Sequence, residues 1–286
     1  MSSLHESFFG AAHNRLAADV FGDAGRSVLL LHGGGQTRHA WRRTAVALAR
    51  AGWVAYAVDQ RGHGDSEWIT DGAYAFGDYA NDIAAVAAEL TRRHGVPPVT
   101  IGASLGGIAS LLAAGEAPGP IFAALVLVDI TPRVDLSGVA KVQGFMRAHA
   151  RDGFASVAEA AEAVAAYLPH RPRPRSTEGL KKNLRLHPDG RWRWHWDPRF
   201  LDGRRPIDGN RSVIEEQLLA GARGLTIPAM LVRGGASELV QEEHAKEFLA
   251  LVPHARYADV SGARHMVAGD KNDQFSAAIL EFLKSL

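Results

Sequence analysis

The sequence predicts an α/β protein with a mostly parallel, eight-stranded sheet flanked by helices. Short apolar runs alternate with segments of helical period, which is the pattern of strand and helix units that build such a sheet. The runs at 27–31 and 123–128 are apolar throughout, as expected of strands covered on both faces. With 286 residues, of which 47% are hydrophobic, the chain is long enough to bury a large core and to carry an insertion.

The alternation divides the chain into a core and an insertion. The eight expected strands lie at 6–10, 14–21, 27–31, 53–58, 99–102, 123–128, 228–233 and 255–260. From residue 133 to residue 225 the alternation stops, and the expected elements are helices at 136–150, 154–167, 176–186 and 210–222. We therefore expect a core domain of residues 1–132 and 226–286, with a helical lid at 133–225 inserted after the sixth strand.

One short turn is the centre of the predicted site. The apolar run that ends at Gly102 is followed at once by a helical pattern from Leu105, so Ser104 lies in an abrupt strand-to-helix turn. Residues 102–106 read Gly-Ala-Ser-Leu-Gly, the pattern of a nucleophile elbow, in which small neighbours let strand and helix approach. The turn presents Ser104 as a candidate nucleophile, and it places the Leu105 amide where it can face a developing oxyanion.

A second loop offers the other half of an oxyanion hole. Residues 32–37 read His-Gly-Gly-Gly-Gln-Thr and directly follow the strand at 27–31. Glycines at the C-terminal end of a strand leave backbone N–H groups bare, and we expect the amide of Gly34 to act together with that of Leu105.

A serine hydroxyl also needs a base, and the base needs an acid that fixes its tautomer. His265 lies in a loop just beyond the last expected strand, which completes the order serine, acid, histidine along the chain. Two carboxylates at the ends of neighbouring strands are candidates for the acid, Asp129 and Glu238. A carboxylate at the C-terminal end of a central parallel strand lies on the edge where open α/β sheets place ligands.

Four segments together resemble the α/β-hydrolase superfamily. They are 32–33 (His-Gly), 59–66 (Asp-Gln-Arg-Gly-His-Gly-Asp-Ser), 102–107 (Gly-Ala-Ser-Leu-Gly-Gly) and 262–265 (Gly-Ala-Arg-His). The resemblance covers residues 6–131 and 226–286, leaves the lid unassigned, and implies the α/β-hydrolase fold while saying little of the substrate. We expect Asp59, Arg61 and His63 to hold the charged turn 59–66 itself through hydrogen bonds from their side chains to the backbone.

The resemblance also bears on the acid. The usual acid loop of the superfamily reads Gly-x-x-Asp, but residues 234–237 read Gly-Gly-Ala-Ser, and Glu238 comes one place later, so its side chain should leave the strand in a different direction. Residues 128–132, Val-Asp-Ile-Thr-Pro, instead resemble a subgroup of small acyl-ester and thioester hydrolases whose acid follows the strand after the elbow. We therefore favour Asp129 and keep Glu238 as the alternative.

The predicted function is that of a serine hydrolase that cleaves a small carboxylic ester or thioester through an acyl-enzyme, with no metal and no organic cofactor. Two alternatives stay open: the same triad could perform perhydrolase or haloperoxidase-like chemistry, C–C bond hydrolysis or cofactor-free oxygenation, or the protein could be a ligand sensor with little turnover. The residues expected to line the substrate pocket are Gly35, Trp194, Trp196 and Met266.

The composition argues against several other classes of protein. The formal net charge of +1 provides no global field for nucleic acid or an anionic membrane. The alternation of Trp and Arg at 191–197 is interpreted as lid packing rather than as a base-stacking surface. Without cysteine the chain has no disulfide and no thiol nucleophile. We find no signal peptide or membrane span, and expect a cytoplasmic monomer or homodimer that acts on a small-molecule acyl substrate.

Overall fold

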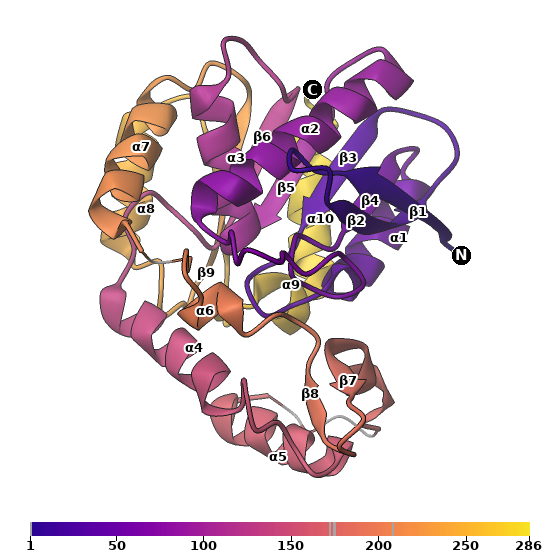
Figure 1. The fold of residues 1–286 in the computed structure, drawn as a ribbon. Coiled ribbons are helices and arrows are strands. Elements are labelled where there is room, and N and C mark those ends of the chain that lie inside the picture. Colours follow the sequence, from indigo (N-terminus) through magenta and orange to yellow (C-terminus); the bar gives the residue numbers. More distant parts are fainter. Residues whose placement is uncertain (1, 172, 174–175, 208) are drawn as a thin grey trace.

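A single eight-stranded sheet forms the centre of the computed structural model, which describes residues 2–171, 173, 176–207 and 209–286 (Figure 1). The strands are β1 (Leu4–Phe9), β2 (Arg15–Phe21), β3 (Ser27–Leu31), β4 (Val54–Val58), β5 (Val99–Ala103), β6 (Ala124–Val128), β9 (Ala229–Gly234) and β10 (Arg256–Val260). They lie in the order β1-β2-β4-β3-β5-β6-β9-β10, in which β1, β2 and β4 pair antiparallel and all other pairs are parallel. The predicted fold class is confirmed.

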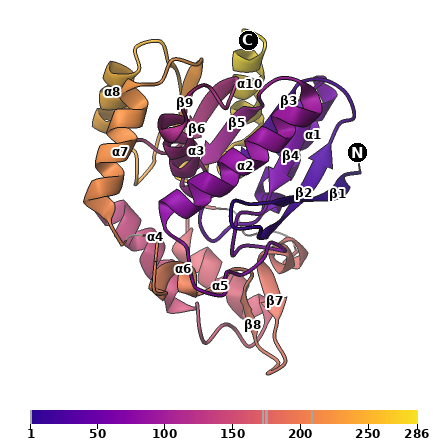
Figure 2. The same ribbon diagram turned by 45° about the horizontal axis from the view of Figure 1, so that its top comes forward.

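Helices cover both faces of this sheet, as Figures 1 and 2 show. One face is covered by α1 (Arg42–Arg50) and α10 (Asn272–Leu283), and the other by α2 (Phe76–His94), α3 (Leu105–Glu116) and α8 (Glu242–Leu251). Because side chains alternate along a strand, Leu29 and Leu31 of β3 join the core on one face, and Val28 and Leu30 join the core on the other. A strand buried on both faces has no polar side, which explains its uninterrupted apolar sequence.

The segment between β6 and β9 lies beside the sheet and extends away from it at the lower end of Figure 1. Its elements are α4 (Leu136–Ala148), α5 (Val157–Tyr167), the 3₁₀ helix η2 (Glu178–Asn183), β7 (Leu184–Leu186), β8 (Trp192–Trp194), α6 (Arg199–Asp202) and α7 (Arg211–Arg223). The described residues contain no helix that combines the length and the apolar character needed to cross a bilayer.

The predicted helix at 176–186 was wrong. The chain forms the short helix η2 there and then the strand β7, which pairs antiparallel with β8, so that Leu184 lies opposite Trp194 and Leu186 opposite Trp192. Three alternating residues are too few to reveal a strand period in sequence, and the partner strand that stabilises them comes later in the chain.

The last helix of this segment belongs with the core. Although the sequence pattern groups residues 210–222 with the lid, α7 packs against α3 and α8. A Cβ built on Gly115 of α3 would lie only 2.8 Å from the Cα of Gly221 in α7, so the two helices touch where neither has a side chain. We therefore use the term insertion for residues 133–210, whose described part projects from the sheet.

The strand order also determines where a ligand can bind. The chain passes from β3 to β4 on one side and then returns to β5 on the other side of β3, so the order reverses between β3 and β5. In open α/β sheets the crevice at such a reversal, beyond the carboxyl ends of the strands, is the usual ligand site. The segment 32–37, which we call the glycine-rich loop, directly follows β3. Ser104 directly follows β5.

Candidate active site

Ser104 occupies a strained turn between β5 and α3. Its φ of 46° and ψ of −111° lie in a region that side chains other than glycine rarely adopt. The turn is tight on both sides, since a Cβ on Gly102 would come within 2.4 Å of the Gly106 carbonyl oxygen, and one on Gly106 within 2.5 Å of the Leu31 carbonyl oxygen. Glycine at 102 therefore lets β5 approach the start of α3, and glycine at 106 lets α3 approach the neighbouring strand β3.

The glycine-rich loop after β3 lies beside Ser104. A Cβ built on Gly33 would be 3.5 Å from the Ser104 Cβ. Within the described part of the chain, the backbone amides of Gly34 and Leu105 donate to no acceptor, whereas the amide of Gly35 donates to His63 Nε2 at 3.1 Å. Gly34 and Leu105 are thus the two donors that remain available to a bound oxyanion.

His32 holds the peptide unit that carries the Gly34 amide. Its Nδ1 donates to the carbonyl oxygen of Gly33 at 2.8 Å, and its Nε2 accepts from the backbone N–H of Gln60 at 3.0 Å. This assignment of the ring hydrogen follows from the two partners. The Gly33 carbonyl and the Gly34 N–H belong to one planar peptide, so a bond to the first fixes the direction of the second.

His63 holds the next peptide of the loop in the same way. Its Nε2 accepts from Gly35, and its Nδ1 donates to the carbonyl oxygen of Arg61 at 3.0 Å. Arg61 is itself fixed by two bonds to Asp82, at 2.7 and 2.6 Å. Burial lowers the pKa of His63 to about 3 and that of His32 to about 4, so at neutral pH both rings are uncharged and can each donate one bond and accept another.

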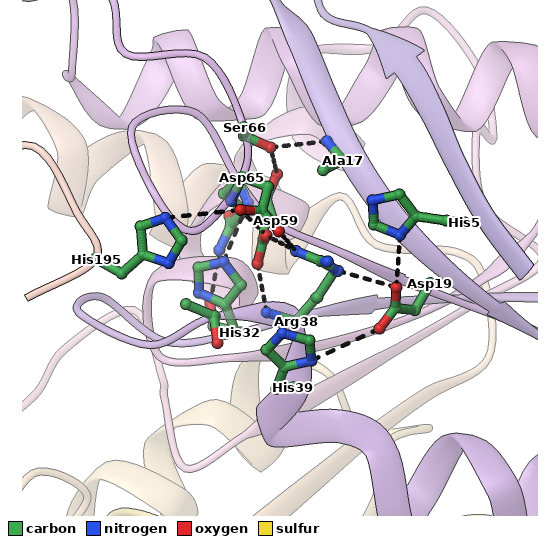
Figure 3. A network of polar contacts seen from close by, with 12 residues as sticks. His5, Ala17, Asp19, His32, Arg38, His39, Asp59, Asp65, Ser66 and His195 are labelled. Atoms are coloured by element: carbon green, nitrogen blue, oxygen red, sulfur yellow. Dashed lines mark hydrogen bonds and ion pairs between the residues drawn. The ribbon is translucent and has the colours of Figure 1, made fainter. Parts of the chain in front are cut away.

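A network of charges fixes the end of the same loop (Figure 3). The side chain of Arg38 is 5% exposed and reaches three carboxylates, those of Asp19, Asp59 and Asp65. Burial opposes the charge of this guanidinium, but the neighbouring carboxylates outweigh it and raise the pKa of Arg38. Asp59 also accepts from the backbone amides of Arg38 at 2.5 Å and Asp65 at 2.9 Å. In the charged turn 59–66, Asp59 accepts from the Asp65 amide, His63 donates to the Arg61 carbonyl oxygen, and Arg61 donates to the Ala73 carbonyl oxygen. These bonds confirm the prediction that the three residues hold this turn.

Asp129 and His265 lie together at the carboxyl edge of the sheet. Asp129 follows β6 with a φ of 50° and is completely buried. Its Oδ2 accepts from His265 Nδ1 at 2.8 Å and from Ser237 Oγ at 2.5 Å, and its Oδ1 accepts from the Gly234 amide at 2.8 Å. The sequence did not assign this role to Ser237; the signal was a serine at the position where the superfamily usually has its acid.

Glu238, the alternative acid, is directed elsewhere. Its carboxylate accepts from Arg264 Nη1 at 2.6 Å and lies 3.6 Å from the ammonium of Lys141. Burial acts to raise the pKa of Glu238, but the hydrogen bond and charge of Arg264 lower it overall. The structure therefore brings Asp129, and not Glu238, to His265.

The glycine-rich loop, Ser104 and His265 all border one cavity of about 620 Å³. Ser104 and His265 both line it, and the Ser104 hydroxyl makes no hydrogen bond within the described residues. The residues expected in the pocket, Gly35, Trp194, Trp196 and Met266, all lie in its wall. Much of the remaining wall is apolar and comes from the insertion, which sequence reasoning left unassigned; it includes Val142, Phe145, Met146, Phe200 and Leu201.

Together with the strand order, this arrangement is that of the α/β hydrolases. The sequence model of the alpha/beta hydrolase fold matches residues 26–271, and the chain belongs to that family.

Two relatives that match this chain over most of its length are hydrolases. The chain is 31% identical over 262 residues to esterase Rv0045c of Mycobacterium tuberculosis, an alignment that covers 90% of this chain and 82% of that protein. It is 30% identical over 220 residues to 2-(acetamidomethylene)succinate hydrolase of Mesorhizobium japonicum, covering 74% and 71% of the two chains. A solved structure of the M. tuberculosis esterase superposes with a TM-score of 0.78 at 28% identity, covering 99% of this chain and 93% of that one. The protein is thus an esterase-like member of the family.

Proposed function

We propose that this protein hydrolyses a small carboxylic ester or thioester, with Ser104 as nucleophile, His265 as base and Asp129 as the acid that orients it. The observation that carries the proposal is the 2.8 Å bond between His265 Nδ1 and the buried Asp129, because it leaves Nε2 free on a ring that shares a cavity with Ser104. The relatedness to an esterase over 90% of the chain supports the reaction class.

The reaction proceeds in two halves. Ser104 Oγ attacks the acyl carbonyl carbon while His265 Nε2 takes the hydroxyl proton, and Asp129 stabilises the imidazolium that results. The amides of Gly34 and Leu105 hold the tetrahedral oxyanion, each contributing about 3 kcal/mol of transition-state stabilisation. His265 then returns the proton to the leaving alcohol or thiol, and a water molecule, activated by the same ring, releases the acid from Ser104.

The insertion acts as the lid of this site. It supplies the aromatic and aliphatic wall of the cavity, including Trp194, Trp196 and Phe200, while the loops of the sheet supply the reacting groups. A dry, apolar wall suits an acyl chain and strengthens the electrostatic interactions near the carbonyl. The reaction uses only side chains and backbone amides of this chain.

The test is labelling with a fluorophosphonate probe together with hydrolysis of p-nitrophenyl butyrate. Wild type should be labelled and active, and Ser104→Ala should lose both properties. Ser110→Ala is the matched control, because Ser110 is buried in α3, the helix that follows Ser104, donates to the Gly106 carbonyl oxygen and lies outside the cavity wall. This variant should keep both properties. Labelling that persists in Ser104→Ala, or a labelled wild type that hydrolyses no ester, would contradict the proposal.

A further inference from the structure

Arg171 of the insertion reaches the cavity next to the loop that carries His265. Its Nε donates to Asp270 Oδ1 at 2.5 Å, and Asp270 Oδ2 accepts from the backbone amide of Arg264, the residue before His265. A Cβ on Gly269 would lie 3.0 Å from Arg171 Nη2, so the guanidinium packs against the backbone of the short helix α9 (Val267–Asp270). Arg171 and His265 are therefore neighbours on one wall.

The Arg171 guanidinium has an unused donor. Its Nη2 is buried and has no hydrogen-bond partner among the described residues, although the side chain as a whole is 27% exposed and lines the cavity. A buried amino group without an acceptor costs free energy, and the cost is larger when the group carries charge. Nη2 itself lies against α9 and has no surface that a ligand could reach, but the side chain is 27% exposed at the cavity wall, and among the described residues only its Nε donates a hydrogen bond. The exposed part of the guanidinium can therefore donate to a ligand oxygen in the cavity.

The charges around Arg171 favour an anionic oxygen over a neutral one. Lys141 and Arg264 share the carboxylate of Glu238, and Arg171 pairs with Asp270. The carboxylate of Asp129 is bonded to His265 but is fully buried and lies outside the cavity wall. At the cavity surface, three cations thus face the carboxylates of Glu238 and Asp270, which leaves one positive charge in excess there. A carboxylate matches both that charge and the planar geometry of a guanidinium, and charge-assisted bonds of this kind are stronger than neutral ones.

We propose that Arg171 binds a carboxylate of the substrate, so that the enzyme prefers esters that carry a negative charge at a distance from the scissile bond. This inference rests on the proposed ester hydrolysis and identifies its substrate class. The apolar wall between Arg171 and the glycine-rich loop holds the carbon chain that connects the carboxylate to the ester.

The test compares charged and neutral esters of matched shape. One pair, mono-p-nitrophenyl adipate and p-nitrophenyl hexanoate, places the charge on the acyl side; a second, 4-acetoxybenzoate and its methyl ester, places it on the leaving group. In wild type, kcat/KM should favour the charged member of at least one pair.

In Arg171→Met this preference should fall about 10- to 100-fold, chiefly through KM, and Arg171→Lys should restore part of it. Arg173→Gln is the matched control, because Arg173 pairs with Glu162 on the surface; it should keep the preference.

A second variant separates binding from a structural role. If Arg171 served only to tie the insertion to α9, Asp270→Asn would weaken the same tie and lower the preference as Arg171→Met does. If Arg171 binds the substrate, Asp270→Asn removes a competing carboxylate and should keep or raise the preference. A wild type without preference in either pair, or equal losses in the two variants, would overturn the inference. Calorimetric titration of Ser104→Ala with the adipate ester measures binding without turnover, so a failure of the proposed hydrolysis would leave the role of Arg171 testable.

Discussion

Asp129 and Arg171 are charged side chains close to the loop that carries His265, but their hydrogen bonding and burial differ. Asp129 is completely buried at the sheet edge and accepts three hydrogen bonds, from a backbone amide, a serine and His265. Arg171 comes from the insertion, is partly exposed, has one acidic partner and keeps one buried nitrogen without an acceptor. A group with every bond made is fixed in place, whereas a group with a bond to spare is available to a ligand.

The same contrast holds for the two regions as a whole. At the sheet edge, short hydrogen bonds among buried groups hold Asp129, His32 and His63, so the positions of the reacting groups are closely determined. The insertion combines aromatic packing, as in the stacked pair Phe145 and Tyr167, whose ring centroids are 4.1 Å apart, with ion pairs at its surface such as Arg173–Glu162. Packing of this kind tolerates substitution more readily than a hydrogen-bonded network does. We therefore propose that the sheet edge carries the reacting groups and that the insertion selects the substrate.

The largest expected effect concerns the acid. Asp129→Ala should lower kcat for p-nitrophenyl butyrate by about 10³- to 10⁴-fold, because the His265 ring loses the partner that fixes its tautomer. Glu238→Ala should lower it by less than about tenfold, since that carboxylate pairs with Arg264. Initial rates of the two variants, with folding checked by circular dichroism, decide the matter. An equal or greater loss at Glu238 would reverse the assignment.

An intermediate effect concerns the two neutral histidines and the pH dependence of stability. Each ring has a folded pKa below its unfolded value of about 6.5, so the unfolded state binds the extra proton as pH falls. Stability is therefore complete above about pH 6.5 and is lost progressively towards pH 4 and below. At pH 5 the loss should be about 2 kcal/mol for each ring.

Urea unfolding between pH 7.5 and pH 5 measures this loss. His63→Gln keeps an acceptor and a donor but cannot titrate, so its stability should fall less steeply than that of wild type. His170→Gln, on the exposed surface, is the control and should keep the steep dependence. Parallel curves for wild type and His63→Gln would show that the ring of His63 does not contribute.

The smallest expected effect lies in the insertion. A Cβ on Gly35 would lie 2.9 Å from Met146 Cε, so Met146 of α4 meets the glycine-rich loop across the cavity. Met146→Ala should enlarge the cavity and shift the preferred p-nitrophenyl ester towards a longer acyl chain, by about three- to tenfold in relative kcat/KM. Leu186→Ala, an exposed position on β7, should leave the chain-length profile as it is. A lower rate for every chain length would mean that Met146 supports the loop instead.

The sequence revealed the sheet edge better than the insertion for a physical reason. Ser104 and the glycines around it form a continuous motif whose geometry follows from local sterics. The buried strands can be recognised in the sequence as apolar runs. For the acid, the direction in which a side chain leaves a strand favoured Asp129, and the contacts agree with that choice. The roles of Ser237 and Arg171 depend on partners about a hundred residues away, which no local pattern encodes.

The contact between Gly115 and Gly221 has a consequence for variation outside the cavity. Because α7 touches α3 there, a side chain at Gly115 would come within 2.8 Å of the Gly221 Cα and must displace α7, although neither glycine lines the cavity. Ile214 and Leu218 of α7 do form part of its wall and would move with the helix. We therefore expect a substitution at Gly115 to change the range of substrates, although this residue does not contact the cavity.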